Sequence, residues 1–381
     1  MKIKTQFFQE KFKVPENLSE RKTSELLCDG VFTFYRNPGI PYYSPIGKKI
    51  IHNLQKILLE ESEKLDFDHV DVPLIIRDEL LEMGQDMRET FRDKVLYLNG
   101  RMKGYHLFTT PEMMMLDLAG VSLISHNQLP IRQVYDVEVF RGIKDSSKIL
   151  KGRQFKTFMG TSFDSDEKSL GKSLELFSTL SKNIFERLGI KTFKRKNVGG
   201  IDTEFFYFCD EGESLNFPEI SQERIKALSL AMSYQYHPNK GQGTRYRNRF
   251  NKNSPLLIGT YGLGTQRVFY AILNSSRDEK GFALPESIKP FEWGIFPFNK
   301  DSEKNAETLY GCLKNEGKQV LLDTRANVTW GKKAKFMDYL GLTKKVVVKS
   351  KKYIVKERGG HELMRTESIA DILELRPKIL S

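Results

Sequence analysis

The stretch of residues 256–273, LLIGTYGLGTQRVFYAIL, restricts the possible folds more than any other part of the chain. Its two apolar runs predict a buried strand that leads directly into a buried helix. Gly259, Gly262 and Gly264 allow a close approach of backbone or ligand, and Arg267 lies near the positively charged N-terminal end of the helix. A cation in that place can stabilise a leaving pyrophosphate. The alternative is close helix packing with Arg267 on the surface, and the missing G-K-S/T ending argues against a P-loop nucleotidase.

A second motif is a strand–loop–strand with an arginine at each inner end. Arg141 ends the strand predicted over residues 131–142, and Arg153 begins the one predicted over residues 153–164. Two arginines opposite each other on antiparallel strands would form a cationic clamp, because planar guanidinium groups match phosphate oxygens. Phe155 is expected on the same face as Arg153, where its ring can stack on a purine. A surface hairpin with two solvated arginines is the alternative.

Length and composition limit the class of protein. With 381 residues the chain is expected to form two or three domains, and its 39% hydrophobic content is enough for a sizeable core. No apolar run reaches the about 18 residues of a membrane helix, and the N-terminal residues lack the apolar core of a signal peptide. Three separated cysteines fit a reducing compartment, and neither they nor the six histidines have metal-ligand spacing. We therefore expect a soluble, cytoplasmic protein without a structural zinc site.

The chain carries a net charge of +12. Such an excess attracts polyanions such as nucleic acid, although a lysine-rich solvated surface produces it as well. Basic residues gather at residues 191–197, 245–252 and 342–358. The last two runs alternate bases with aromatic or β-branched residues, a pattern that suits strands carrying cations along a phosphate backbone.

The hydrophobic pattern predicts two architectures in succession. Residues 46–65 and 169–189 have apolar residues at helical spacing, and residues 67–75 alternate like a strand. Together with the two strands above, they indicate an antiparallel sheet decorated with helices over residues 1–289. From about Pro290, alternating strands and helices indicate a small α/β domain with a partly parallel sheet. In that domain, residues 290–381, we expect helices at 301–316 and 332–342, strands at 318–324 and 344–350, and a terminal helix.

In order and spacing, these motifs resemble the three signature motifs of class II aminoacyl-tRNA synthetases. The motifs are a strand ending at Pro73 after a long helix, the strand–loop–strand with its arginines, and G-x-x-G-x-G-x-x-R before a helix. Further segments are similar to prolyl-tRNA synthetases, namely YYSPIGKKIIHNLQKIL, LFTTPEMMMLDLAG, QLPIRQVYDVEVFR and DEKGFALPESIKPFEWGIFP. EGKQVLLDTRANVTWGKKAKFMDYLGL resembles the anticodon-binding domain of prolyl, threonyl, glycyl and histidyl enzymes. The resemblance implies an α+β fold, with a class II catalytic core over residues 1–289 and an anticodon-binding α/β domain over residues 290–381.

The resemblance implies roles for individual side chains in ATP binding. The family's counterpart of Arg267 holds the γ-phosphate of a bent ATP. The counterpart of Arg141 binds the α-phosphate, where the amino-acid carboxylate attacks. Arg153 would assist at the phosphates, and Phe155 would stack on adenine. Further ATP contacts would come from Gln242, Thr244 and Gly264.

The resemblance also implies an amino-acid site, to which Gly262 would belong. Thr110 and Glu112 match the T-x-E that receives the substrate amine, and a carboxylate suits this task because a substrate ammonium needs a charged acceptor. Without the resemblance, the two residues would be read as a helix cap with a first-turn charge. Glu204 is a candidate metal or substrate contact, with a structural role as the alternative.

Several residues depart from the family's pattern. Ile143 replaces a carboxylate that contacts adenine or the tRNA end, and Met113 replaces a glutamate. Gln154, Phe158 and Met159 stand where charged or polar residues are usual. These changes predict a more apolar pocket wall and a shift in substrate choice or rate. The short spacing between the second and third motifs also leaves no room for the editing insertion of many bacterial prolyl enzymes.

Three functions remain open. The first is activation of proline with ATP and Mg²⁺ and its transfer to tRNA-Pro by a homodimer joined through the long helix and the Pro73 strand. The second is a paralogue that applies the same adenylation to another small amino acid or acceptor, which the altered pocket wall favours. The third is a non-catalytic tRNA-binding relative, against which the retained Arg141, Arg153 and Arg267 argue.

Overall fold

The structure is a computed structural model that describes the chain except residues 4–8, 83–91, 112–116, 120–124, 147–148, 238–243 and 376–381. The described residues form two compact units. One consists of residues 1–34, 43–53 and 273–381, and the other of residues 35–42 and 54–272. The predicted division at residue 290 lies inside the first of these units and remains a prediction. Among the described residues, no helix is both long enough and apolar enough to cross a membrane.

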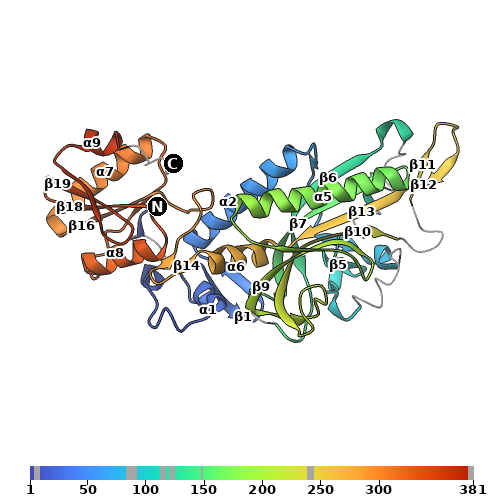
Figure 1. The fold of residues 1–381 in the computed structure, drawn as a ribbon, viewed down its shortest axis with the longest axis horizontal. Helices are drawn as coiled ribbons and strands as arrows, with labels where there is room; N and C mark the ends of the chain where they lie inside the picture. The colour runs from blue at the N-terminus through green and yellow to red at the C-terminus, as the bar shows by residue number, and fades with distance from the viewer. Residues whose placement is uncertain are drawn as a thin grey trace. The chain divides into compact units, whose positions relative to one another are not determined.

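A seven-stranded sheet forms the centre of the unit that contains residues 54–272 (Figure 1). All its neighbouring strands pair antiparallel except the first two, which are parallel. The predicted antiparallel sheet and the strands predicted at 131–142 and 153–164 are therefore confirmed. In spatial order, the strands are β3 (Asp68–His69), β6 (Ile131–Phe140), β7 (Gln154–Asp164), β13 (Leu257–Leu263), β10 (Ile225–Tyr236), β9 (Ile201–Leu215) and β8 (Phe193–Val198).

Helix α5 (Glu167–Arg187) packs across β7, β13 and β10 (Figure 1). Its N-terminus is capped by Asp166, whose carboxylate accepts a hydrogen bond from the Ser169 N–H, and its buried stripe faces the sheet. Phe177 stacks on the Tyr261 ring at 5.1 Å between centroids. A Cβ at Gly160 would lie 2.6 Å from the Phe177 ring, so only glycine allows this close helix–sheet contact.

The strand predicted over residues 67–75 is wrong as a continuous element. Only β3 and β4 (Ile75–Arg77) form there, and they belong to different sheets, since β4 pairs with β5 (Tyr105–Leu107). Pro73 lies between them and has no N–H to donate to a ladder. By contrast, the predicted long helix is confirmed as α2 (Pro45–Glu63), and the helix after the glycines as α6 (Thr265–Ser275).

A second sheet of five strands, in the order β17-β16-β18-β19-β20, lies in the unit that includes residues 273–381. β16 is parallel to both β17 and β18, and the last three strands are antiparallel. The partly parallel sheet is thus confirmed, but β19 and β20 intervene before the terminal helix. The elements are β16 (Trp293–Pro297), α7 (Glu303–Asn315), β17 (Val320–Leu322), α8 (Trp330–Tyr339), β18 (Lys344–Lys349), β19 (Lys352–Glu357), β20 (Glu362–Thr366) and α9 (Ile369–Leu373).

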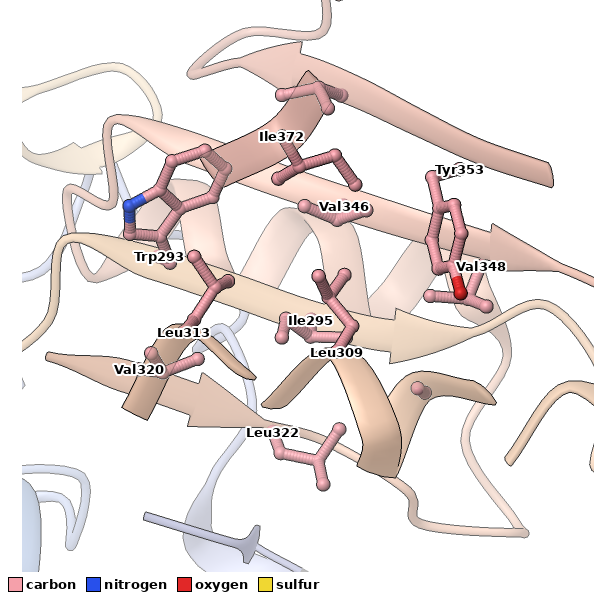
Figure 2. Close-up of a cluster of buried hydrophobic side chains, with 12 residues drawn as sticks. Trp293, Ile295, Leu309, Leu313, Val320, Leu322, Val346, Val348, Tyr353 and Ile372 are labelled. Carbon is pink, nitrogen blue, oxygen red and sulfur yellow. The ribbon is translucent and has the colours of Figure 1, made fainter. Parts of the chain in front are cut away.

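Strand alternation divides the second sheet into two packed faces. Ile295 and Val346 point to the face covered by α7 and α9, where they join Leu309 in a buried cluster (Figure 2). On the other face, a Cβ at Gly294 would lie 2.3 Å from the Met337 sulfur of α8. The N-terminal segment belongs to the same unit, with the Phe32 ring 6.0 Å from that of Tyr339. The shorter elements of the chain are α1 (Thr23–Cys28), β1 (Thr33–Asn37), β2 (Ile40–Tyr43), β11 (Arg245–Arg247), β12 (Asn253–Pro255), β14 (Arg277–Asp278) and β15 (Gly281–Phe282).

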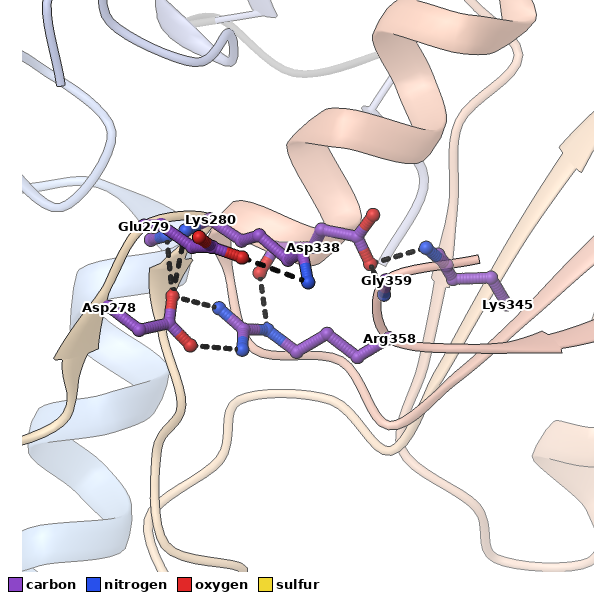
Figure 3. Close-up of polar contacts among 8 residues, drawn as sticks. Asp278, Glu279, Lys280, Asp338, Lys345, Arg358 and Gly359 are labelled. Carbon is purple, nitrogen blue, oxygen red and sulfur yellow. Dashed lines mark hydrogen bonds and ion pairs between the residues drawn. The ribbon is translucent and has the colours of Figure 1, made fainter. Parts of the chain in front are cut away.

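A polar network ties the β14–β15 turn to α8 and to the β19–β20 turn (Figure 3). Arg358 donates two hydrogen bonds to the Asp278 carboxylate, one of them at 2.7 Å, and a third to the Asp338 carbonyl at 2.8 Å. The Asp338 carboxylate accepts from the Gly359 N–H at 3.0 Å and from the Lys345 ammonium. The hydrogen bonds from Arg358 hold the pKa of Asp278 below its ordinary value.

Leu309→Ala is expected to lower the free energy of unfolding by about 2–5 kcal/mol, because it leaves a cavity in the core of the second sheet. Both tryptophans, Trp293 and Trp330, lie in this region, so denaturant unfolding followed by tryptophan fluorescence reports on it. Leu373→Ala is the control, since Leu373 is 37% exposed and its loss should cost far less. Equal losses for the two variants would contradict the assigned core.

Asp278→Asn is expected to lower the melting temperature at neutral pH. The pKa of Asp278 is lower in the folded state, so its contribution to stability is present above the ordinary value of 3.8 and is lost as the pH falls through the folded pKa. The difference between wild type and variant should therefore shrink in acid, as measured by thermal melts at a series of pH values. Glu279→Gln, at the exposed neighbouring carboxylate, is the control and should change the melting temperature at neutral pH far less than Asp278→Asn does.

Candidate functional site

A cavity of about 460 Å³ lies over the central strands β7, β10 and β13 of the seven-stranded sheet. The start of α6 and the loop before β7 complete its walls, so the strand–loop–strand and the glycine motif meet at one place. Its volume is within the range of small-molecule sites. Six of the side chains and glycines predicted for the site line this cavity, namely Thr110, Arg141, Phe155, Gly262, Gly264 and Arg267.

The glycines of the opening motif have different tasks. A Cβ at Gly259 would lie 2.5 Å from the Ser162 hydroxyl on β7, so this glycine serves strand packing. At Gly262 a Cβ would meet no atom within 4 Å. Since Gly262 lines the cavity, its missing side chain leaves space for a ligand rather than for a neighbouring strand.

Arg267 is held by the backbone of two other segments. Its guanidinium donates to the Ser229 carbonyl at 3.0 Å and to the Leu150 carbonyl at 3.3 Å. Glu213 lies 3.6 Å from the same group. Burial lowers the pKa of Arg267 from its ordinary value, yet arginine stays charged in proteins. The result is an oriented cation at the cavity wall.

Arg141 lies at the end of β6 and stacks on an aromatic ring. Its guanidinium carbon is 5.2 Å from the centroid of Phe155, and its Nε donates to the Thr109 carbonyl at 3.3 Å. Cation–π contact and carbonyl together fix the direction of the guanidinium. The expected stacking of Phe155 on adenine remains a prediction, and in the structure the Phe155 ring contacts Arg141.

Arg153 is not among the described residues that line the cavity. Its guanidinium donates to the carbonyls of Ile143 at 3.0 Å and Lys144 at 3.1 Å. β7 begins only at Gln154, so the alternation that was expected to place Arg153 beside Phe155 does not extend to it. Arg153 fastens the loop after β6, and its proposed part in phosphate binding stays untested.

The remaining predicted residues lie elsewhere or outside the described residues. Glu112 and Gln242 belong to the residues that the structure does not describe. Thr244 precedes β11, where its carbonyl accepts from the Leu256 N–H at 2.9 Å. Glu204 is nearly buried on β9, 3.6 Å from the Arg195 guanidinium, an arrangement that favours its structural role. In the described part of the chain, no three histidine, cysteine or acidic residues gather as a metal site.

Of the five residues at which the pocket wall departs from the family's pattern, Met113 lies outside the described residues and two of the other four reach the cavity. Ile143 and Met159 line it, and Met159 follows Phe155 and Thr157 on the same face of β7. Phe158 points to the opposite face, where it is fully buried. Gln154 instead donates to Glu138 on β6. Among the described residues, therefore, only Ile143 and Met159 contribute to the apolar cavity wall that the sequence predicts.

Sequence reasoning missed Glu213, which reaches the cavity from an irregular part of β9. The pairing of β9 with β10 shifts register after Tyr207–Phe208, so residues 209–213 bulge out of the ladder. A Cβ at Gly212 would lie 2.5 Å from the backbone of Ala227, so glycine permits the bulge. Glu211 accepts from the Tyr270 hydroxyl at 2.9 Å, and Glu213 faces Arg267. The sequence signal that could have indicated this bulge is Gly212 between Glu211 and Glu213, inside a strand.

No protein-family model matches the chain. Sequence comparison finds the proline–tRNA ligases of Bartonella henselae, 25% identical over 371 residues, and of Ehrlichia ruminantium, 27% identical over 359 residues. Each alignment covers 81% of this chain, with 84% and 83% of the respective relatives.

Two solved structures are similar in fold. The prolyl-tRNA synthetase of Cryptosporidium parvum, complexed with halofuginone and AMPPNP, has a TM-score of 0.73 at 19% identity. The enzyme of Giardia lamblia in complex with prolyl-adenylate has a TM-score of 0.71 at 17% identity. Each comparison covers 92% of this chain, with 75% and 74% of those chains. The chain thus resembles prolyl-tRNA synthetases in sequence and has their class II fold.

Proposed function

We propose that this chain, a relative of the prolyl-tRNA synthetases, activates proline with ATP and transfers the prolyl group to tRNA. The observation that carries the proposal is the meeting of Arg141 and Arg267 in one cavity above a glycine floor. The two arginines are far apart in sequence and each is oriented by backbone carbonyls. Such preorganised cations suit a substrate that develops negative charge on phosphate oxygens.

In the first step, a carboxylate oxygen of proline attacks the α-phosphorus of ATP. The bond from that phosphorus to the bridging oxygen breaks, which gives prolyl-adenylate and pyrophosphate. The carboxylate is its own nucleophile, so no side chain has to act as a strong base, and positioning and charge neutralisation carry the step. Arg141 would hold the α-phosphate, and Arg267 would hold the γ-phosphate that leaves with pyrophosphate. In the second step, a terminal ribose hydroxyl of tRNA attacks the prolyl carbonyl and releases AMP.

The cavity fits an ATP that brings its own magnesium. Mg²⁺ in nucleotide sites is usually held by phosphates, water and one or two carboxylates, and it neutralises phosphate charge. Glu213 is the one carboxylate among the described residues that line the cavity. It would hold the ion beside Arg267, while Thr110 and Glu112 would receive the amine of proline. The partners are tRNA-Pro and a second copy of the chain joined through α2 and the Pro73 segment, in the cytoplasm.

A paralogue that activates another small amino acid is the second candidate. Ile143 and Met159 in the cavity wall favour it, because they replace groups that are polar or charged in the family. Both candidates share the adenylation step and differ in the amino acid that is activated or in the acceptor that receives it.

Amino-acid-dependent ATP–pyrophosphate exchange, measured with each of the twenty amino acids, separates the candidates. We expect exchange with proline above all others, with and without tRNA. Exchange with a different amino acid would establish the second candidate. No exchange with any amino acid, from a protein that still binds tRNA, would refute both.

Arg141→Gln and Arg267→Gln are each expected to lower kcat/KM of this exchange about 10²- to 10³-fold, because each removes a preorganised donor to phosphate. Arg153→Gln should lower it less than about 10-fold, since Arg153 acts on the loop through carbonyls. Thermal melts of all three variants check that the fold is retained. If Arg153→Gln lowers kcat/KM as much as the other two variants, Arg153 also contacts the phosphates.

A further inference from the structure

A hairpin of residues 244–255 carries the second basic run of the sequence. β11 and β12 pair antiparallel, with Tyr246 opposite Ser254. Both strands belong to the same unit as the cavity, and the hairpin lies at one end of the seven-stranded sheet (Figure 1). We call residues 244–255 the basic hairpin. The proposed chemistry does not use it.

The basic hairpin is anchored at its base. Tyr246 and Leu256 are buried in a cluster with Phe163 of β7, Tyr236 of β10 and Ile258 of β13. The Tyr246 hydroxyl also donates to the Ser165 carbonyl at 3.3 Å. The hairpin is therefore fixed to the central sheet by apolar packing, and its direction follows that of the sheet.

The loop at its tip has a defined conformation. The Asn248 side chain accepts from the N–H groups of Phe250 at 2.9 Å and Lys252 at 3.0 Å, and donates to the Ser254 hydroxyl at 2.8 Å. Asn251 takes the left-handed backbone, with φ of 57°, which asparagine tolerates. These bonds fix the backbone of the tip, which lowers the entropy that the loop backbone loses on binding.

The exposed side chains of the basic hairpin are strongly cationic. Arg245, Arg247, Arg249 and Lys252 are exposed, and residues 244–255 contain no acidic residue. Among the described residues, no carboxylate forms an ion pair with any of these four. Arg187, by contrast, is paired with Glu60 and Glu61. The four positive charges of the hairpin face solvent without a compensating carboxylate in the described part of the chain.

Phe250 at the tip is 68% exposed, the largest value among the exposed large hydrophobic residues of the described chain. The Arg249 guanidinium lies 4.8 Å from its ring centroid. An exposed ring beside an arginine is an arrangement with which proteins stack on unpaired bases while they neutralise the adjoining phosphates. The Phe250 ring lies apart from the apolar cluster that anchors the hairpin through Tyr246 and Leu256.

We propose that the basic hairpin binds RNA, with Arg245, Arg247, Arg249 and Lys252 on phosphates and Phe250 stacked on an unpaired base. This inference rests on the proposed function, in which the RNA is the tRNA substrate. RNA fits better than a membrane surface, because a rigid two-stranded tip offers one ring and no amphipathic helix. The hairpin then adds an RNA contact to the unit that holds the cavity.

The test compares Arg247→Gln/Arg249→Gln with Lys168→Gln/Lys172→Gln, which removes the same charge from exposed positions on α5. Binding of unfractionated tRNA is measured at several salt concentrations. The hairpin variant should bind about 10-fold more weakly and lower the slope of log K against log salt by about 1.5, since each lost phosphate contact lowers it by about 0.7–0.9. The α5 variant should leave both values near those of the wild type. Equal effects of the two variants would overturn the proposal.

Phe250→Ser separates stacking from charge. It should weaken tRNA binding about 5- to 100-fold with the salt slope unchanged, because base–aromatic stacking is not ionic. Unchanged binding would remove Phe250 from the interface and overturn the stacking part of the proposal. If the wild type binds phosphatidylserine vesicles and the hairpin variants lose that binding while they keep tRNA binding, the hairpin is a membrane contact and the RNA proposal is overturned.

Proline-dependent ATP–pyrophosphate exchange, run without tRNA, distinguishes this proposal from the proposed function. The hairpin variants should keep wild-type exchange while KM for tRNA rises in the charging reaction. If wild type itself shows no exchange, the proposed function fails, and the tRNA-binding comparison still decides the role of the hairpin. If exchange is normal and the hairpin variants match the α5 variant in tRNA binding, only the RNA proposal fails.

Discussion

Close packing of α5 onto the seven-stranded sheet is the contact on which the other features of this unit depend. Phe177 lies between the rings of Phe67 and Tyr261, at 5.0 and 5.1 Å between centroids. Glycine at position 160 of β7 makes room for that ring. Because interiors pack at crystal-like density, this contact fixes β7 and β13 relative to each other. The same two strands supply much of the cavity floor, so the precision of the site derives from a packing contact with α5.

The cationic side chains of the site are oriented by the protein backbone. Arg141 and Arg267 both donate to main-chain carbonyls, and Arg153 does so from outside the cavity. Carbonyl acceptors direct a guanidinium without cancelling its charge, whereas carboxylate partners would cancel it. Glu213 lies 3.6 Å from Arg267, and its exposed position lets solvent screen this pair. The hydrogen bonds to carbonyls thus orient the guanidinium groups and leave their charge available to an anionic ligand.

The sequence was informative where local periodicity and long-range packing agree. The strands β6 and β7 and the helices α2, α5 and α6 have patterns that match their burial. Residues 67–75 alternate but form no continuous strand, because neighbours in space decide which backbone groups are paired. Arg153 was placed by an alternation that begins only one residue later, at Gln154. Glu213 reaches the cavity through a bulge, and the size of a register shift is not encoded in the pattern of one strand.

The way in which chain segments are divided between the two units has a consequence for folding during synthesis. One unit is nearly continuous, with residues 54–272, whereas the other joins residues 1–34 and 43–53 to residues 273–381. Arg277 donates to the Leu18 carbonyl at 2.5 Å, and Phe32 packs on Phe282 and Tyr339. Since domains fold during synthesis as their residues emerge, the continuous unit can fold on the ribosome first. The N-terminal segment can complete its packing only after residues 273–381 have emerged, and until then Phe32 lacks the rings of Phe282 and Tyr339 that cover it in the folded chain.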